Sequence, residues 1–205
     1  MKILITGGSG LLGTKLTSVL SREHQVASTY FTKKENGHIH LDVTNLDQVT
    51  DVLTQTRPDV VIHAAAISDP DICEIVKQKA WQINVIGTRN IAMICKQNNT
   101  KLVYISTDYV FDGKSSASYS EADQPNPVNY YGLTKLAGEQ FIQREVPNYL
   151  IVRVPIFYGF NNEEDKLTFV TEVINKLKVG EKVYADNKQV RYPTLIDDIS
   201  AAVNE

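Results

Sequence analysis

The sequence predicts an α/β protein built on a doubly wound parallel sheet. First, strand-like apolar runs alternate with helix-length segments along the chain, which is typical of βαβ units. Second, these runs are continuous in Val, Ile and Leu rather than alternating with polar residues, as expected for strands covered on both faces. Third, glycines follow the first run and open the first helix. Because βαβ crossovers are right-handed, such units favour a doubly wound sheet.

Strands and helices alternate in the expected order through the first three quarters of the chain. The strands are expected at 2–6, 25–30, 37–43, 59–66, 101–107 and 149–154. The helices are expected at 11–23, 45–57, 71–98 and 130–145, with a polar loop at 112–127. Asn45 is the expected N-cap of the second helix, because its side chain can accept a hydrogen bond from the first turn.

The pattern weakens in the last part of the chain. The expected elements there are an amphipathic helix at 166–180 ended by Gly180, a short strand at 181–185 and a helix that starts at Asp197. We therefore expect one domain over residues 1–155 and a small, partial substrate-binding region over 156–205. A helix of two turns is marginal by itself, so we expect the remainder of a second domain to lie outside this sequence.

The composition fits a globular protein with one ordinary core: 205 residues, 42% hydrophobic and 22% charged, with a formal net charge of −3. No basic stripe predicts nucleic-acid binding, and no apolar run approaches the ~20 residues of a membrane span. The N-terminus runs straight into a strand, unlike a signal peptide. Cys73 and Cys95 lack CxxC spacing, which indicates reduced thiols in a cytoplasmic protein. No cluster of His, Cys and carboxylates predicts a metal site.

The segment "ITGGSGLLG" places Gly7, Gly10 and Gly13 between the first strand and the first helix. Glycines let the backbone turn tightly and approach a pyrophosphate, whose charge is stabilised by the N–H groups of a helix N-terminus. A glycine triplet alone could be a mere tight turn, but its place between strand and helix is the context that supports dinucleotide binding. The sequence therefore predicts a Rossmann-type NAD(P)-binding domain over 1–155.

The end of the second strand bears on which dinucleotide is bound. An NAD site usually carries an acidic residue about 20 residues after the glycines, whereas this chain has "TYFTKKE" there. Lys33 and Lys34 could meet a 2′-phosphate, which favours NADP(H), with NAD(H) as the alternative; the two lysines could equally be a solvated loop pair. Asp42 is positioned either for the adenine edge or for a turn.

Five segments together carry a resemblance to a known family: "TGGSGLLG", "DVVIHAAA", "VYISTDYVFDG", "PNPVNYYGLTKLAGE" and "VRVPIFYG", in this order. They resemble the extended short-chain dehydrogenase/reductase superfamily, and most closely the dTDP-4-dehydrorhamnose reductase family. The same motifs are similar to the NADP-binding regulatory beta subunit of methionine adenosyltransferase. The resemblance covers most of residues 1–160.

The resemblance gives the motif Tyr131-x-x-x-Lys135 a role. Residues four apart lie on one helix face, and a nearby ammonium would lower the pKa of a tyrosine from its usual value of about 10. In the family, Tyr131 would donate the proton, Lys135 would also bind the nicotinamide ribose, and Thr107 would hold the substrate oxygen. Ser106 competes for the hydroxyl role, and Tyr130 could replace Tyr131 only by losing the spacing to Lys135.

The complete set of expected site residues follows from the glycine turn, the strand ends and the resemblance. The expected catalytic residues are Thr107, Tyr131 and Lys135. The expected cofactor-binding residues are Gly7, Ser9, Gly10, Leu11, Leu12, Gly13, Tyr30, Phe31, Thr32, Lys33, Lys34, Asp42, Val43, Ala64, Ala65, Ala66, Tyr131 and Lys135.

Four further polar residues have a structural interpretation as well as a functional one. His63 has no partner by spacing and is expected to be a core histidine. Asn84 is expected to be a buried hydrogen-bonding residue. Asp108 and Asp112 either meet substrate or end turns.

The function implied by the resemblance is NADPH-dependent reduction of a nucleotide-linked 4-keto-6-deoxy sugar. Tyr109 follows Thr107-Asp108 where sugar-nucleotide dehydratases commonly carry Glu, which argues against dehydration. Ile156 stands where the rhamnose family usually carries Trp, which leaves two alternatives open: a non-catalytic NADP-binding regulatory subunit, or an epimerase-like enzyme. The expected partner is a nucleotide sugar, with a homodimer left open, and neither nucleic acid nor membrane is expected.

Overall fold

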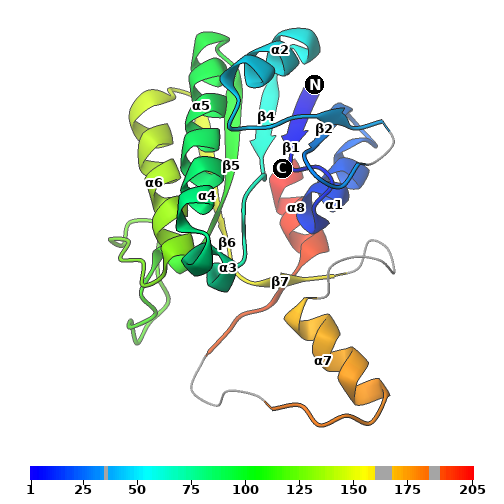
Figure 1. The fold of residues 1–205 in the computed structure, drawn as a ribbon, viewed down its shortest axis with the longest axis vertical. Helices are drawn as coiled ribbons and strands as arrows, with labels where there is room; N and C mark the ends of the chain where they lie inside the picture. Colours follow the sequence, from blue (N-terminus) through cyan, green and yellow to red (C-terminus); the bar gives the residue numbers. More distant parts are fainter. Residues whose placement is uncertain (35–36, 160–167, 185–189) are drawn as a thin grey trace.

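A six-stranded parallel sheet forms the centre of the computed structural model, which describes residues 1–34, 37–159, 168–184 and 190–205. The strands are β1 (Lys2–Thr6), β2 (Gln25–Tyr30), β3 (Ile39–His40), β4 (Val60–His63), β5 (Lys101–Thr107) and β6 (Tyr149–Val154). Their order is β3-β2-β1-β4-β5-β6, so the winding reverses beside β1 (Figure 1). This is the doubly wound Rossmann-type order, and the predicted fold class is confirmed.

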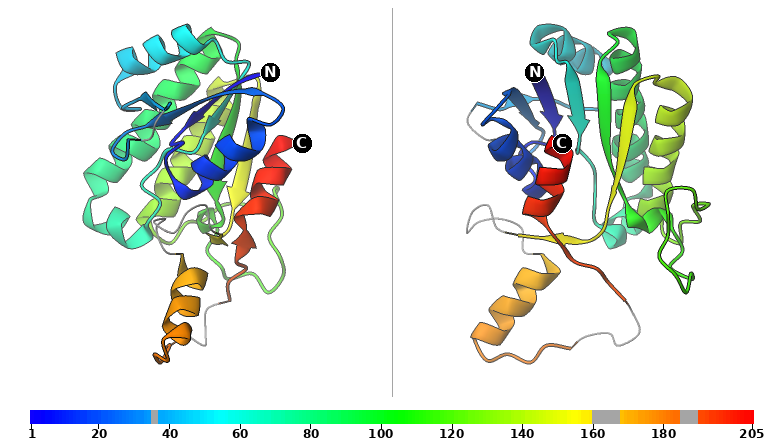
Figure 2. Two further views of the ribbon diagram at one scale, coloured as in Figure 1. Left: turned by 90° about the vertical axis from the view of Figure 1, so that its right-hand side faces the viewer. Right: turned by 180° about the vertical axis from the view of Figure 1, so that it is seen from behind.

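Helices cover both faces of the sheet. Neighbouring residues of a strand point to opposite faces. Ile3 and Ile5 of β1 pack with α1 (Leu11–Leu20) and α8 (Ile196–Asn204). Leu4 packs with the other layer, which consists of α2 (Leu46–Thr56), α5 (Thr88–Gln97) and α6 (Tyr130–Glu145). Figure 2 shows the two helical layers on either side of the sheet. Asn45 caps α2 as predicted, accepting a hydrogen bond of 3.0 Å from the Gln48 backbone N–H.

The helix predicted at 71–98 is wrong as a single element. The chain forms α3 (Pro70–Ile75), α4 (Lys77–Trp81), a π-helical turn η1 (Gln82–Gly87) and then α5. Helix α3 ends because Val76 leaves the helical region, at φ −111° and ψ 48°. The π-turn brings Gly87 against Val43, where an added Cβ would lie 2.6 Å from Val43 Cγ2. Local propensity cannot show either break, because both depend on tertiary contacts.

The last part of the chain forms small elements that return to the main body. β7 (Phe157–Tyr158) pairs in parallel with β8 (Thr194–Leu195). Helix α7 (Phe169–Lys178) stands away from the sheet (Figure 1). The strand predicted at 181–185 is wrong for 181–184, which have no regular structure, and Ala185 lies outside the described residues.

Helix α8 packs beside α1 on the sheet, where the Lys15 ammonium lies 2.5 Å from the Asp197 carboxylate. Residues from the expected C-terminal region therefore complete the core of the N-terminal domain; the boundary at residue 155 stays a proposal. Within the described ranges, no helix combines the length and the apolar character needed to cross a membrane.

Candidate functional site

The glycine turn forms a close-packed cradle at the end of β1. Gly7 has φ +72°, and an added Cβ there would lie 2.8 Å from the Ala65 backbone N and Cα. The Gly10 N–H donates to the Gly7 carbonyl at 3.0 Å. Gly13 packs so tightly that an added Cβ would overlap the Gly7 carbonyl oxygen. Helix α1 starts here without a side-chain cap, which leaves its N-terminal N–H groups available for an anion.

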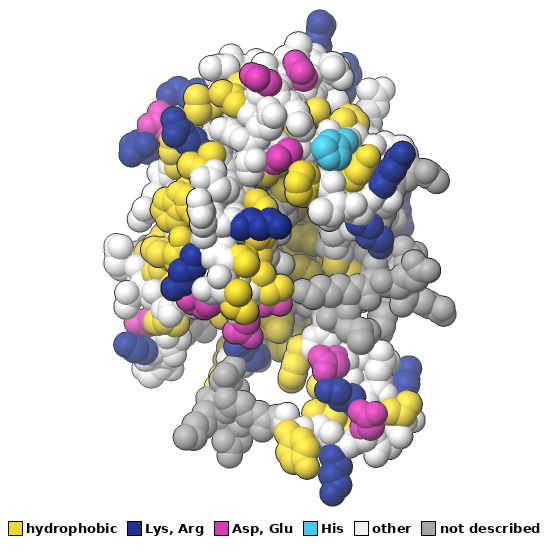
Figure 3. Space-filling view, in the orientation of Figure 1, with side chains coloured by type: hydrophobic (Ala, Val, Ile, Leu, Met, Phe, Trp, Pro, Cys, Tyr) yellow, Lys and Arg dark blue, Asp and Glu magenta, His cyan; other side chains and the backbone are white. Residues whose placement is uncertain are grey.

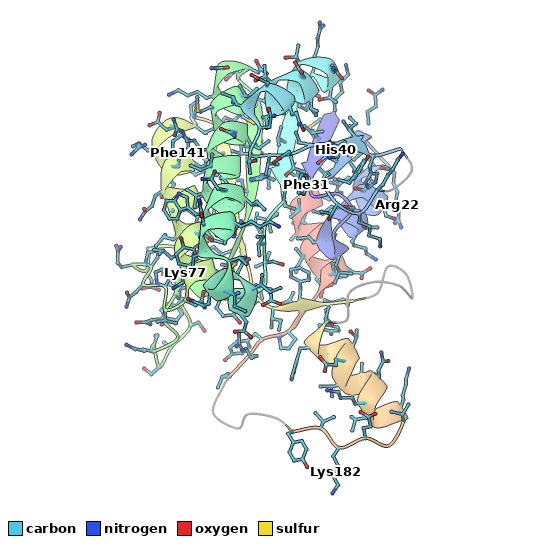
Figure 4. All side chains as sticks on the ribbon, in the orientation of Figure 1. Arg22, Phe31, His40, Lys77, Phe141 and Lys182 are labelled. Carbon is cyan, nitrogen blue, oxygen red and sulfur yellow. The ribbon has the colours of Figure 1, made fainter. Side chains whose placement is uncertain are left out.

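A cavity of about 770 Å³ opens beside this turn, which is within the range of small-molecule sites. Phe31 at the end of β2 and Lys77 at the start of α4 contribute to its walls, and both are labelled in Figure 4. Apolar side chains gather in the hollow between these two sides (Figure 3). Six of the expected cofactor residues line the cavity: Gly7, Tyr30, Phe31, Asp42, Val43 and Ala65.

The other expected cofactor residues near the turn and the strand ends do not line this cavity. They are Ser9, Gly10, Leu11, Leu12, Gly13, Thr32, Lys33, Lys34, Ala64 and Ala66. Leu12 is buried in the core between α1 and the sheet, whereas Lys33 and Lys34 are exposed beyond Phe31. Their cofactor roles stay proposals.

Ten lining residues were missed by the sequence reasoning. They are Thr29, Leu41, Thr44, Ile75, Val76, Lys77, Gln78, Lys79, Gln82 and Ile83. Seven of them lie in the segment predicted as one helix, so the break at Val76, which gave no sequence signal, turns them toward the cavity. Asp42 is also a turn residue: its Oδ1 accepts hydrogen bonds from the Thr44 N–H at 2.9 Å and the Thr44 hydroxyl at 2.7 Å.

Thr107 and Tyr131 come together at the carboxyl edge of the sheet. Thr107 ends β5, Tyr131 lies in the first turn of α6, and both are buried. Asn129 caps α6 by accepting a hydrogen bond of 2.7 Å from the Gly132 N–H. Burial raises the pKa of the Tyr131 phenol, and the Thr107 hydroxyl beside it partly opposes this shift. The Tyr109 ring lies edge-on to Tyr131, with centroids 6.0 Å apart.

The two competing residues have other partners. The Ser106 hydroxyl donates to the Glu139 carboxylate rather than facing Tyr131. The Tyr130 ring lies under the Lys77 ammonium, 5.3 Å from Nζ to the ring centroid. The geometry therefore favours Thr107 and Tyr131 over their neighbours.

Lys135 lies one turn after Tyr131 and is only 2% exposed. Its Nζ sits 3.9 Å from the centroid of the Tyr104 ring. Burial lowers the pKa of Lys135 to about 7, while the Glu139 carboxylate acts in the opposite direction. The expected lowering of the Tyr131 pKa by this ammonium is not observed, because burial outweighs it and the pKa is raised.

His63 and Asn84 are structural, as expected. His63 is fully buried, with Nδ1 2.6 Å from the Thr6 hydroxyl and Nε2 3.0 Å from the Thr88 hydroxyl. The Asn84 side chain accepts from the Ile67 N–H at 2.8 Å and donates to the Ile67 carbonyl at 3.0 Å. Asn84 thereby ties the π-turn to the chain that follows β4.

We expect His63 to make stability depend on pH. Burial, with a smaller effect of Lys135, lowers its pKa from 6.5 to about 3. Below pH 6.5 the unfolded state binds a proton that the folded state does not, so stability is lost as pH falls toward 3. The loss approaches 1.4 kcal/mol per pH unit, or about 2 kcal/mol at pH 5.

Urea unfolding at pH 7.5 and pH 5 checks this expectation. His63→Gln should lose about 2 kcal/mol less than the wild type between these pH values. The exposed His40→Gln variant is the matched control and should keep the wild-type difference. An equal pH difference in the His63 variant and the wild type would contradict the assignment.

The loop after β5 is organised by Asp112. Its carboxylate accepts hydrogen bonds from the Tyr119 hydroxyl at 2.6 Å and the Asn126 amide at 3.1 Å. These hydrogen bonds lower its pKa to about 2, so Asp112 serves the loop. Asp108 is exposed and accepts from the Thr107 hydroxyl at 3.2 Å. Arg191, missed from the sequence, donates to the Tyr109 hydroxyl at 2.5 Å.

Comparison with known proteins shows the family of the chain. All of residues 1–205 match the family described as RmlD substrate binding domain. The chain belongs to this family. The resemblance to the dTDP-4-dehydrorhamnose reductase family predicted from the motifs is thereby confirmed. Across the described ranges of this RmlD-family chain, no group of three or more His, Cys, Asp or Glu residues is placed to hold a metal ion.

Three relatives illustrate the range of the RmlD family. A crystal structure of dTDP-4-dehydrorhamnose reductase from Bacillus anthracis, in complex with NADP, is 37% identical with a TM-score of 0.89, covering 99% of this chain and 69% of that one. The probable low-salt glycan biosynthesis reductase Agl14 of Haloferax volcanii is 30% identical, over 100% of this chain and 70% of that protein. The methionine adenosyltransferase 2 subunit beta of Danio rerio is 32% identical, over 97% of this chain and 61% of its own length.

Proposed function

We propose that this RmlD-family protein is an NADP(H)-dependent reductase of a nucleotide-linked 4-keto-6-deoxy sugar. The observation that carries the proposal is the Thr107 hydroxyl beside the Tyr131 phenol, at the edge of the sheet where the glycine cradle also lies. In open α/β sheets, ligands bind outside the carboxyl ends of the strands. The 37% identical reductase that was solved with NADP supports the choice of cofactor.

The residues present fit a dinucleotide. A Cβ at Gly7 or Gly13 would fill space that a close-packed backbone turn occupies, and the adjacent cavity of about 770 Å³ is walled by Tyr30, Phe31 and Val43. NADPH, when bound, supplies the hydride. The N-terminal N–H groups of α1 would neutralise part of the pyrophosphate charge, and Lys135 would hold the ribose at the nicotinamide end.

The chemistry of the protein's own residues follows from their environment. The Thr107 hydroxyl would orient the ketone oxygen by hydrogen bonding. The raised pKa keeps the proton on Tyr131 at neutral pH, so the phenol is ready to donate when negative charge develops on that oxygen. Tyr109 and Tyr131 pack edge to edge, which restricts the ring to one orientation.

The decisive experiment follows NADPH absorbance with dTDP-4-dehydrorhamnose as substrate. We expect consumption of NADPH that depends on the sugar. Absence of turnover in a protein that still binds NADP would overturn the reductase proposal. An epimerase would interconvert sugars without net NADPH consumption, so product analysis in the same assay separates that alternative.

A regulatory role is the second candidate, favoured by the 32% identity to methionine adenosyltransferase 2 subunit beta. Under this alternative the protein would bind NADP without turnover and would change the activity of a methionine adenosyltransferase catalytic subunit. Assaying that subunit with and without this protein tests the alternative directly.

Coenzyme choice gives a further prediction. If Lys33 and Lys34 meet the 2′-phosphate, their double replacement by Ala should raise the Kd for NADP at least about tenfold, corresponding to about 1.4 kcal/mol, and leave the Kd for NAD unchanged. Calorimetric titration measures both. Lys77→Ala is the matched comparison, because Lys77 lines the cavity. A selective loss of NADP binding in that variant, with none in the double variant, would move the assignment to α4.

A further inference from the structure

A buried acid continues the helix stripe that carries the proposed catalytic pair. Tyr131, Lys135 and Glu139 follow each other at intervals of four on α6, so they share one face. Glu139 is only 1% exposed. Burying a carboxylate is costly unless it is paired and hydrogen-bonded, so its partners define what it does.

Glu139 joins three elements around the site. Arg153 of β6 donates from Nη2 to Oε2 at 2.7 Å and from Nε to Oε1 at 3.1 Å. Ser106 of β5 donates its hydroxyl to Oε1. Ser106 and Arg153 are partners in the sheet register, and Ser106 immediately precedes Thr107. The Arg153 guanidinium also lies over the Phe111 ring at 5.0 Å, where the loop after β5 begins.

The same carboxylate acts on the buried Lys135 ammonium. The titratable and charged groups around Lys135 are Tyr131 and Glu139 on α6, Tyr104 on β5 and His63 on β4, with Arg153 on β6 behind Glu139. Of these five, Glu139 alone carries a negative charge at neutral pH, since His63 is held neutral by burial. Removing it would also leave the Arg153 charge uncompensated inside the same cluster.

We propose that Glu139 is a positioning residue for the reductase site: its carboxylate keeps the buried Lys135 ammonium charged and ties the strand end that carries Thr107 to α6. The inference rests on the proposed function for its catalytic meaning. Arg153 limits the strength of the effect, because it shares the Glu139 charge. Lys135 is thereby held close to the point at which loss of one neighbouring charge would neutralise it.

The direct test is a titration of Lys135 in the free protein, by NMR of lysine labelled with ¹³C at the ε-carbon, assigned with Lys135→Arg. In Glu139→Gln the midpoint should fall by about one pH unit or more relative to the wild type. Glu145→Gln is the matched control, since Glu145 lies on the same helix but pairs with Lys96 and Arg144 at the surface. An unchanged Lys135 midpoint in Glu139→Gln would overturn the proposal.

A second variant of opposite sign covers the case in which Glu139→Gln does not fold. Arg153→Gln removes the cation that competes for the Glu139 carboxylate, so the Lys135 midpoint should rise. A fall, or no change, would count against the proposal. A purely structural role of the pair predicts no such direction.

Turnover provides the functional readout. In Glu139→Gln the loss of kcat at high pH should begin at lower pH, by the same shift as the NMR midpoint, with KM for the sugar little changed. Glu145→Gln should keep the wild-type profile. Because the NMR titration needs neither substrate nor cofactor, a normal shift in a protein without turnover would refute the reductase function and not the electrostatic link.

Discussion

Replacing Tyr131 by Phe is expected to lower kcat by about 10³-fold, while NADPH still binds. The substitution removes the proton donor and little else. The Phe ring retains the packing of Tyr131 with Cys73, Ala80 and Tyr109. The Thr107 hydroxyl keeps its other partners, the Tyr109 N–H and the Asp108 carboxylate, both at 3.2 Å.

Single-turnover rates and NADPH titration together measure the two halves of this expectation. Tyr130→Phe is the matched control: its ring lies beside Lys77 rather than Thr107, so its kcat should stay close to wild type. If Tyr131→Phe kept more than about a tenth of the wild-type kcat, another group would have to donate the proton. A parallel loss of NADPH binding would instead indicate a structural role.

Replacing Gly13 by Ala should weaken NADP binding at least tenfold, about 1.4 kcal/mol, and destabilise the fold. The added Cβ would overlap the Gly7 carbonyl and lie 2.7 Å from Gly8 Cα. Both are backbone atoms, so no side chain can rotate out of the way. Overpacking of this kind costs about 1–3 kcal/mol, and the displaced backbone is the turn that would receive the pyrophosphate.

Calorimetry for NADP and urea unfolding for stability measure this effect. Gly113→Ala separates steric overlap from backbone strain, because Gly113 has φ +70° but no atom within 4 Å of an added Cβ. It should cost about 1 kcal/mol of stability and leave NADP binding unchanged. Wild-type NADP affinity in Gly13→Ala would show that the turn does not hold the cofactor.

Periodicity and turn chemistry were sufficient to predict most of the sheet and its main helices. The strands at 101–107 and 149–154 and the helix at 130–145 have the predicted bounds. These segments combine a clear apolar pattern with local caps, such as Asn129 for α6. The strand expected at 37–43 is shorter, Ile39–His40. The glycine turn was predictable for the same reason: glycine spacing between a strand and a helix has few other uses.

The sequence by itself determined the fold class, the glycine cradle and the identity of the Thr107–Tyr131–Lys135 set, because backbone propensity and motif spacing are local properties. Only the tertiary structure decided that the break at Val76 turns α4 toward the cavity, and that the Lys135 ammonium lies over Tyr104. It alone joined Glu139 to Arg153. Burial and charge pairing act between residues far apart in the chain, so no local pattern records them.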